Sequence, residues 1–175
     1  MFYGTHKGEE ENVIDTREES IKALRAVPII AWALTNGLDD VALRRRPAPD
    51  AWAAIEVVAH MVDTDERALE RIRRMRDEDA PELAAFDQDA LAIERAYRTL
   101  AIEPTLQRLQ GTIAVLVTDL GGLDDAGWRR IGQHAAHGRI SIADYLAHVA
   151  AEDIDHLAQI ARLRDRHDDP IDRLR

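Results

Sequence analysis

The stretch DYLAHVAAEDIDHLAQI, residues 144–160, has the residue spacing of an amphipathic helix. At 100° per residue its apolar side chains fall in one sector, with His156 near the centre and Glu152 at the border. Their i, i+4 spacing places both side chains on one face, one turn apart. A buried carboxylate or imidazole needs a partner. A shared metal ion or a simple hydrogen bond would serve, and this helix alone favours the hydrogen bond.

The rest of the chain predicts an all-α fold, because strand signals are nearly absent and Ala, Leu, Arg and Glu dominate. Asn36-Gly37 and Gly121-Gly122 are helix-ending pairs, Asp50 is a candidate N-cap, and Ser141 with Asp144 resembles a capping box. Besides the last helix, long helices are predicted over about 13–35, 51–75 and 104–120, with a short helical piece over 89–99.

These segments predict a four-helix bundle with an additional short helix between helices 2 and 3. The bundle is expected to cover residues 13–167, between a flexible segment over 1–12 and a tail over 168–175. In the first helix, Ile29 and Trp32 belong to the apolar positions. The long connection between helices 2 and 3 permits a topology other than simple up-down.

Composition excludes several classes of protein. The 175 residues contain no cysteine, which rules out disulfides, zinc knuckles and a cysteine nucleophile. A formal net charge of -10 argues against nucleic acid as a partner. No signal peptide or membrane span is predicted, so a soluble cytoplasmic protein is expected. The four arginines of RIRRMR, residues 71–76, are interpreted as a solvated helix end.

A third ligand for a metal would have to come from another helix, since bundle cores build metal sites from facing helices. The second long helix offers His60, although periodicity places it on the flank of the apolar arc. Its neighbours Glu56, Asp63 and Thr64 are candidates to hold the imidazole in place.

Two longer patterns carry more information than any single residue. RRPAPDAWAAIEVVAHMVDTDE contains W...E...H..D..E, which starts at Trp52, and GWRRIGQHAAHGRISIADYLAHVAAEDIDHLAQI contains G-x-H, ending at His134, before the last helix. In this order and spacing, across residues 12–165, the chain resembles the DinB-like superfamily of metal-binding four-helix bundles, which includes YfiT-type proteins. The resemblance implies a homodimeric all-α bundle.

The resemblance also implies a divalent metal ion, which one histidine of helix 2 and two of helix 4 hold. The matching residues here are His60, Glu152 and His156, with Glu152 where the family usually has histidine. Two imidazoles and a carboxylate remain a competent set for zinc or non-haem iron, and nickel or manganese stay open. The substitution equally fits a member that has lost its metal. His148 lies one turn before Glu152, so a displaced array of His148, Glu152 and His156 is an alternative.

Known members of the superfamily include thiol-dependent transferases and candidate metal-dependent hydrolases. The resemblance therefore implies S-transferase-like chemistry on a small molecule, in which the metal activates a low-molecular-weight thiol and His134 acts as acid or base. A metal-dependent hydrolase is one alternative. A noncatalytic dimeric bundle that binds a small molecule or serves as an interaction module is the other.

Overall fold

The computed structural model describes residues 7–168, and within them the side chains of residues 16–166. Its four long helices confirm the predicted bundle: α1 (Lys7–Thr35), α3 (Ala54–Asp77), α5 (Ile102–Gly121) and α7 (Ile142–Asp168). Shorter helices are α2 (Asp40–Leu43), α4 (Gln88–Glu94), the 3-10 turn η1 (Tyr97–Thr99) and α6 (Asp125–Trp128). The predicted short helix between helices 2 and 3 corresponds to α4 and η1. The predicted tails lie largely outside the described residues and stay predictions.

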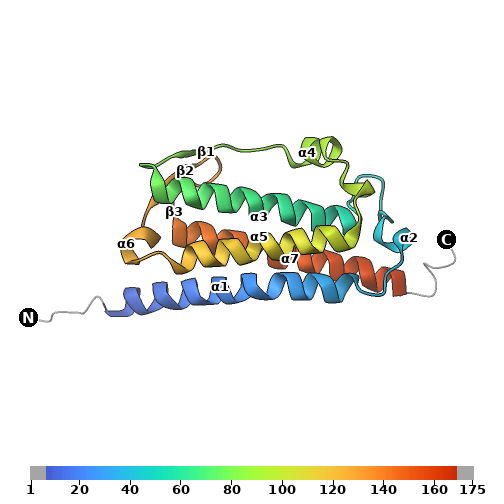
Figure 1. The fold of residues 1–175 in the computed structure, drawn as a ribbon, viewed down its shortest axis with the longest axis horizontal. Helices are drawn as coiled ribbons and strands as arrows, with labels where there is room; N and C mark the ends of the chain where they lie inside the picture. Colours follow the sequence, from blue (N-terminus) through green and yellow to red (C-terminus); the bar gives the residue numbers. More distant parts are fainter. Residues whose placement is uncertain (1–6, 169–175) are drawn as a thin grey trace, which may run out of the picture.

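The long helices do not follow a simple up-down order. In Figure 1, α1 and α7 run from left to right, whereas α3 and α5 run from right to left. Helices α5 and α7 each contact both α1 and α3, so α1 and α3 occupy opposite corners of the bundle. Because α3 and α5 are parallel, the segment 78–101 must return along the whole length of α3 before α5 can begin.

The C-terminus of α1 ends as its sequence predicts. Gly37 has φ +84°, a left-handed conformation that glycine adopts without steric cost. Across the bundle, Arg164 of α7 donates hydrogen bonds to the carbonyl oxygens of Ala33, Leu34 and Asn36 at 2.9 to 3.0 Å. These carbonyls have no helical partner of their own, so Arg164 ties the parallel pair α1 and α7 together.

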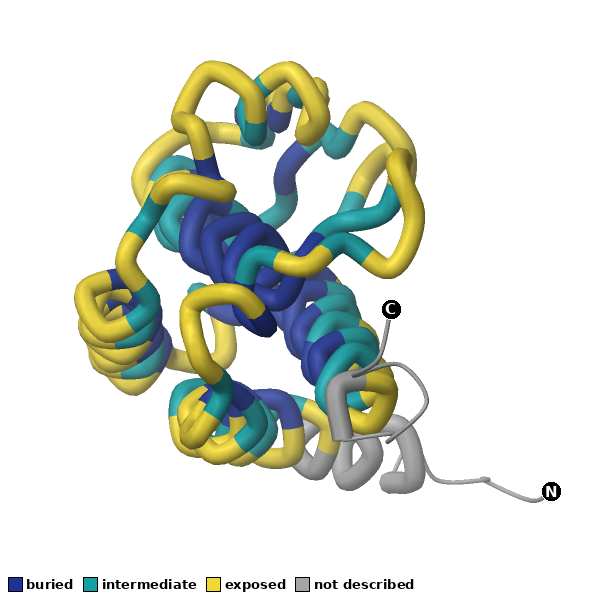
Figure 2. Tube along the Cα trace, turned by 90° about the vertical axis from the view of Figure 1, so that its right-hand side faces the viewer, coloured by how far each residue is buried: buried dark blue, intermediate teal, exposed yellow. Residues whose placement is uncertain are grey.

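Helix α3 is the most enclosed element of the fold. Every residue from Ala53 to Asp63 is buried, so this half of the helix is covered on all sides. Helices α5 and α7 cover the inner side, and α4, η1 and α2 also contact α3. Figure 2 shows buried segments gathered on the inner faces of the helices, with exposed loops outside. A flank position on α3, such as that of His60, is therefore buried as well.

The start of α3 differs from the prediction. The helix begins at Ala54 with Ala53 at the N-cap position, and Asp50 does not cap it. Instead, the carboxylate of Glu56 accepts a hydrogen bond from the Ala53 amide at 2.9 Å. The prediction failed because Asp50 lies in a turn in which the Ala51 amide donates to the Ala48 carbonyl, so the helix starts three residues later than predicted.

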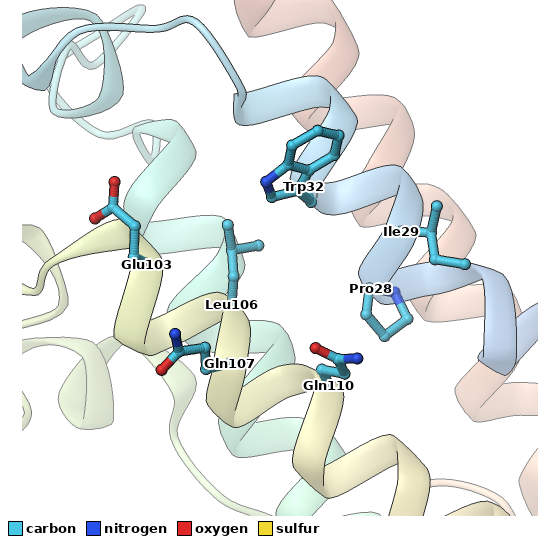
Figure 3. Close-up of a pocket in the computed structure, with 7 residues that line it drawn as sticks. All are labelled: Pro28, Ile29, Trp32, Glu103, Leu106, Gln107 and Gln110. Carbon is cyan, nitrogen blue, oxygen red and sulfur yellow. The ribbon is translucent and has the colours of Figure 1, made fainter.

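Two apolar residues predicted to face the core of the bundle lie at the surface. Ile29 is 69% exposed and Trp32 is 57% exposed. Both are among the residues around a cavity of about 360 Å³ between α1 and α5, with Leu106 of α5 on the opposite wall (Figure 3). Helix α1 occupies a corner of the bundle, so its apolar residues extend beyond the arc that α5 and α7 cover.

The arginine run at the end of α3 behaves in two ways. Arg73, Arg74 and Arg76 form surface ion pairs with Asp119, Glu78 and Asp77, as expected for a solvated helix end. Arg71 is only 8% exposed, so the prediction is wrong for this residue.

Among the described helices, none is long and apolar enough to span a membrane.

A small sheet was not foreseen from the sequence. Its strands are β1 (Glu82–Leu83), β2 (Ile131–His134) and β3 (Gly138–Ser141), with β2 parallel to β1 and antiparallel to β3. Strands this short show no useful alternation of apolar and polar residues. The sheet fixes the loop before α7 against the segment after α3, and it places His134 beside Leu83.

Gly132 allows this close approach of β1 and β2. A Cβ atom at Gly132 would lie 2.8 Å from Leu83 Cδ1 and 3.1 Å from Met75 Cγ, and both side chains are buried. We predict that Gly132→Ala lowers the free energy of unfolding by about 1–3 kcal/mol through overpacking. Urea denaturation followed by circular dichroism measures the change.

Gly111→Ala is the matched control, because a Cβ at this position in α5 meets nothing within 4 Å. It should raise the free energy of unfolding by about 0.5–1 kcal/mol, as expected for alanine replacing glycine inside a helix. If Gly132→Ala were as stable as the wild type, the packing of Leu83 against β2 would be wrong.

Candidate metal centre

His60 lies in the enclosed half of α3 and is 4% exposed. The indole of Trp52 packs against its ring, with centroids 4.8 Å apart. Its Nδ1 atom is buried and has no hydrogen-bond partner among the described residues. Burial, followed by the neighbouring His156, lowers the pKa of His60 to about 4. At neutral pH the ring is uncharged, the form in which histidine binds metals.

His156 meets His60 from the facing helix α7. The two ring centroids are 4.7 Å apart and the rings are nearly perpendicular, at 77°. His156 Nδ1 lies 3.2 Å from Gln159 Oε1. Since an amide oxygen can only accept, Nδ1 carries the proton and Nε2 is left with a free lone pair. The structure therefore brings together two of the three predicted ligands.

Glu152, the third predicted ligand, faces elsewhere in this structure. Its side chain is 46% exposed, and Oε1 lies 3.4 Å from His148 Nε2. As they lie, no group of three or more His, Asp or Glu side chains within the described part of the chain could hold a metal ion. The donor chemistry still fits a divalent ion: two imidazoles converge, one buried nitrogen lacks a partner, and a carboxylate lies one turn away. The fit requires Glu152 to turn from His148 toward His156.

The side chains predicted to fix the His60 ring direct their hydrogen bonds to other groups. Glu56 pairs with Arg46 at 2.5 Å. Asp63 accepts a hydrogen bond from the Tyr97 hydroxyl at 2.5 Å. The hydroxyl of Thr64 donates to the backbone carbonyl of His60. The prediction is wrong because these polar groups bind Arg46, Tyr97 and the backbone of α3 instead. The indole of Trp52 is what packs against the ring.

His60 and Glu152 line one cavity of about 190 Å³, together with His134, the predicted acid or base. The other lining residues come from α3, α7 and the segment after β1: Thr64, Arg71, Ala85, Phe86, Gln88, Tyr145, His148 and Val149. His134, His60 and Glu152 thus share a cavity, although they come from β2, α3 and α7. The cavity is smaller than a typical site for a drug-sized ligand, which favours a small substrate.

His134 stands at the end of β2. Its Nδ1 accepts hydrogen bonds from the amides of Ala136 and His137, both at 3.3 Å. Burial, followed by the charge of Arg71, lowers the pKa of His134. The ring is therefore neutral at pH 7, with its proton on Nε2.

His148 belongs to a separate group of imidazoles. Its Nε2 lies 3.3 Å from His137 Nε2, and the ring of His137 stacks on His134. His148 contacts Glu152, but among the described residues no hydrogen bond or ring contact joins it to His156, so the displaced array of His148, Glu152 and His156 gains no support from this geometry.

A pair of buried carboxylates lies beside the candidate site. Asp65 of α3 is 0% exposed and Asp153 of α7 is 2% exposed. Neither oxygen of Asp65 has a partner among the described residues. Burial, followed by the charges of Asp153 and Glu152, raises the pKa of Asp65 well above its ordinary value of 3.8. Burial and Glu152 raise the pKa of Asp153 to about 7.

This fold and these residues place the chain among helical bundles that build a site from side chains on facing helices. The model of the DinB superfamily matches residues 17–160, so the chain belongs to the DinB superfamily.

Relatives of known name agree with this assignment. A protein of Geobacillus thermodenitrificans named "Putative metal-dependent hydrolase" is 28% identical over 164 residues, which cover 93% of this chain and 92% of that protein. A protein of Oceanobacillus iheyensis with the same description is 24% identical over 151 residues, covering 86% and 87%.

A solved structure supports the fold. YfiT from Bacillus subtilis, described as "a probable metal-dependent hydrolase with an unusual four-helix bundle topology", superposes with a TM-score of 0.81. The match covers 86% of this chain and 87% of YfiT at 21% identity.

We predict that Asp65→Asn stabilises the protein at pH 8 by about 1–3 kcal/mol, because it removes an unpaired buried carboxylate. With a raised folded-state pKa, the folded protein keeps a proton that the unfolded chain releases above its pKa of 3.8. Wild-type stability therefore falls as pH rises above that value, and the gain from Asp65→Asn should shrink toward zero near pH 4.

Thermal unfolding at a series of pH values measures this effect. Asp155→Asn is the control, because Asp155 is exposed on α7, the helix that carries Asp153. This change should alter stability little. A loss of stability in Asp65→Asn at every pH would show that Asp65 is ionised and paired in the folded protein.

Proposed function

We propose that the protein is a divalent-metal-dependent enzyme that acts on a small molecule, and that its reaction is hydrolysis. The observation that carries this proposal is the meeting of the His60 and His156 rings, which come from facing helices, beside a cavity that His60 lines. The names of the relatives favour hydrolysis over other metal-assisted reactions.

His60, His156 and Glu152 are the proposed ligands. Trp52 packs on one ring and Gln159 orients the other, so both imidazoles are held before any ion arrives. Glu152 would add one negative charge to a set of two neutral ligands, which increases the attraction for a cation. A divalent ion held there supplies Lewis-acid activation of water or of a substrate oxygen.

His134 is proposed to contact the substrate from the other side of the cavity. In its neutral form, with the proton on Nε2, it can donate a hydrogen bond to an oxygen that gains charge during the reaction. Phe86 and Val149 line the same cavity and exclude water from part of it.

Thiol-dependent S-transferase chemistry remains a prediction from the sequence. The same ligands would serve it, but a thiol would have to come from a separate small molecule, because the chain has no cysteine. A noncatalytic bundle requires that the His60 and His156 pair have a purely structural role. The unpartnered Nδ1 of His60 argues against this reading, since a structural histidine normally satisfies its buried nitrogen.

We predict that untagged protein binds one divalent ion per chain after loading with zinc, nickel, iron or manganese. His60→Ala and His156→Ala should each weaken binding by at least about 100-fold, and Glu152→Gln by about 10- to 100-fold. Elemental analysis after gel filtration gives the stoichiometry, and competition with a chelator gives the affinities.

His148→Ala is the matched control, since it removes a histidine next to Glu152 that is not a proposed ligand. It should bind the ion at least as well as the wild type, because it frees Glu152 from its contact with His148. The ligand set is wrong if His148→Ala loses the ion while His60→Ala keeps it. Wild-type protein that never binds a stoichiometric ion would contradict metal dependence itself.

A further inference from the structure

Arg71 carries a buried positive charge that no carboxylate balances. The residue is 8% exposed, and it donates hydrogen bonds to the carbonyl of Ala84 and, at 3.1 Å, to the hydroxyl of Tyr145. Within residues 16–166, no Asp or Glu oxygen lies within ion-pair distance of it. A buried, uncompensated charge is costly, so a site that tolerates one is suited to a ligand of opposite charge.

Three hydrogen-bond donors meet at this point. The Tyr145 oxygen accepts from Arg71, which leaves the hydroxyl hydrogen free to donate. His134 Nδ1 accepts from two backbone amides, so the proton of this neutral ring is on Nε2. That nitrogen lies 3.5 Å from Arg71 Nη1. Two donors cannot bond to each other, and an acceptor oxygen beside them would satisfy both.

The donors line the same cavity as His60 and Glu152, two of the three proposed metal ligands. Arg71 and His60 are eleven residues apart on α3, close to three full turns, so they share a face of the helix about 16 Å apart along its axis. Helical side chains lean toward the N-terminus, which brings the guanidinium of Arg71 back toward His60. Glu152 lines the cavity too, but it does not reach Arg71.

We infer that Arg71, Tyr145 and His134 bind a negatively charged oxygen group, a carboxylate or a phosphate, of a small-molecule ligand. That this group belongs to the substrate rests on the proposed function, whereas the anion site itself requires no metal. The fork of a guanidinium matches the paired oxygens of both groups. A molecule bound there would extend along α3 toward His60.

Anion titrations of the full-length protein test this inference. Inorganic phosphate and acetate are titrated separately in the presence of a chelator, at an ionic strength held constant with chloride. Heteronuclear NMR follows the amides of residues 84–86 and 134–137. Arg71→Met should weaken binding of the preferred anion at least tenfold. The preference between phosphate and acetate identifies which oxygen group the site takes.

Arg73→Met is the matched control, because it removes the same charge from an exposed position two residues away. It should leave anion binding within about twofold of the wild type, since an exposed charge is largely screened at constant ionic strength. Equal losses in Arg71→Met and Arg73→Met would overturn the inference, because they would reflect the overall charge alone.

Two further variants keep the test valid if Arg71→Met fails to fold. Arg71→Lys keeps the charge but loses the fork, and Tyr145→Phe removes one donor, so both should bind the anion more weakly than the wild type. Wild-type protein with no saturable binding of either anion would overturn the inference.

The variant His60→Ala separates the anion site from the proposed metal site. It should retain the anion while losing the metal, and loss of the anion in this variant would contradict an independent anion site.

Discussion

The enclosure of α3 is the constraint on which the rest of the structure depends. In the half of α3 that is buried on every side, polar side chains cannot turn to water, so an unpaired polar group there destabilises the fold. Arg46 neutralises Glu56, and Tyr97 with Arg95 satisfies Asp63. Among the side chains of α3, His60, Asp65 and Arg67 keep a buried unpartnered atom, and Arg71 keeps a buried charge without a carboxylate partner. His60 and Arg71 line a cavity that Glu152 and His134 also line.

The unusual order of the long helices produces this enclosure. Since α3 and α5 are parallel, the segment 78–101 must travel back along α3, and it covers the side that a simple up-down bundle would leave open. That segment supplies Tyr97 to Asp63, the carbonyl of Ala84 to Arg71, and Phe86 to the cavity wall. A connection that topology requires thus also forms one wall of the candidate site.

Local signals allowed the helices to be predicted, because capping depends on a few adjacent residues. Gly37 ends α1, and the Ser141 hydroxyl accepts from the Asp144 amide at the start of α7. Burial could not be predicted in the same way. Periodicity placed His60 on a flank, since nothing in the local sequence shows that a later segment covers it. The same limit applies to Trp32, whose helix lies at a corner of the bundle.

The candidate site shows a similar division. The meeting of His60 and His156 followed from matched motifs on two helices, and the structure brings the two rings together. The orientation of Glu152 toward His148 depends on a side-chain rotamer, which sequence does not determine. Arg71 could not be distinguished by sequence from the other three arginines of its run. It is buried because α7 and the segment after β1 lie against it and supply Tyr145 and the carbonyl of Ala84.

The two ends of the cavity have complementary chemical roles. In a chain with a net charge of -10, an anionic molecule is repelled at long range, so its binding must come from local donors. Arg71, Tyr145 and His134 provide such donors away from the imidazole pair. Contacts to a part of the substrate that does not react can position the reacting bond, because their binding energy offsets the entropy of orientation. A substrate held by an anionic group at Arg71 would therefore present its other end to His60 and His156, where the reaction is proposed to occur.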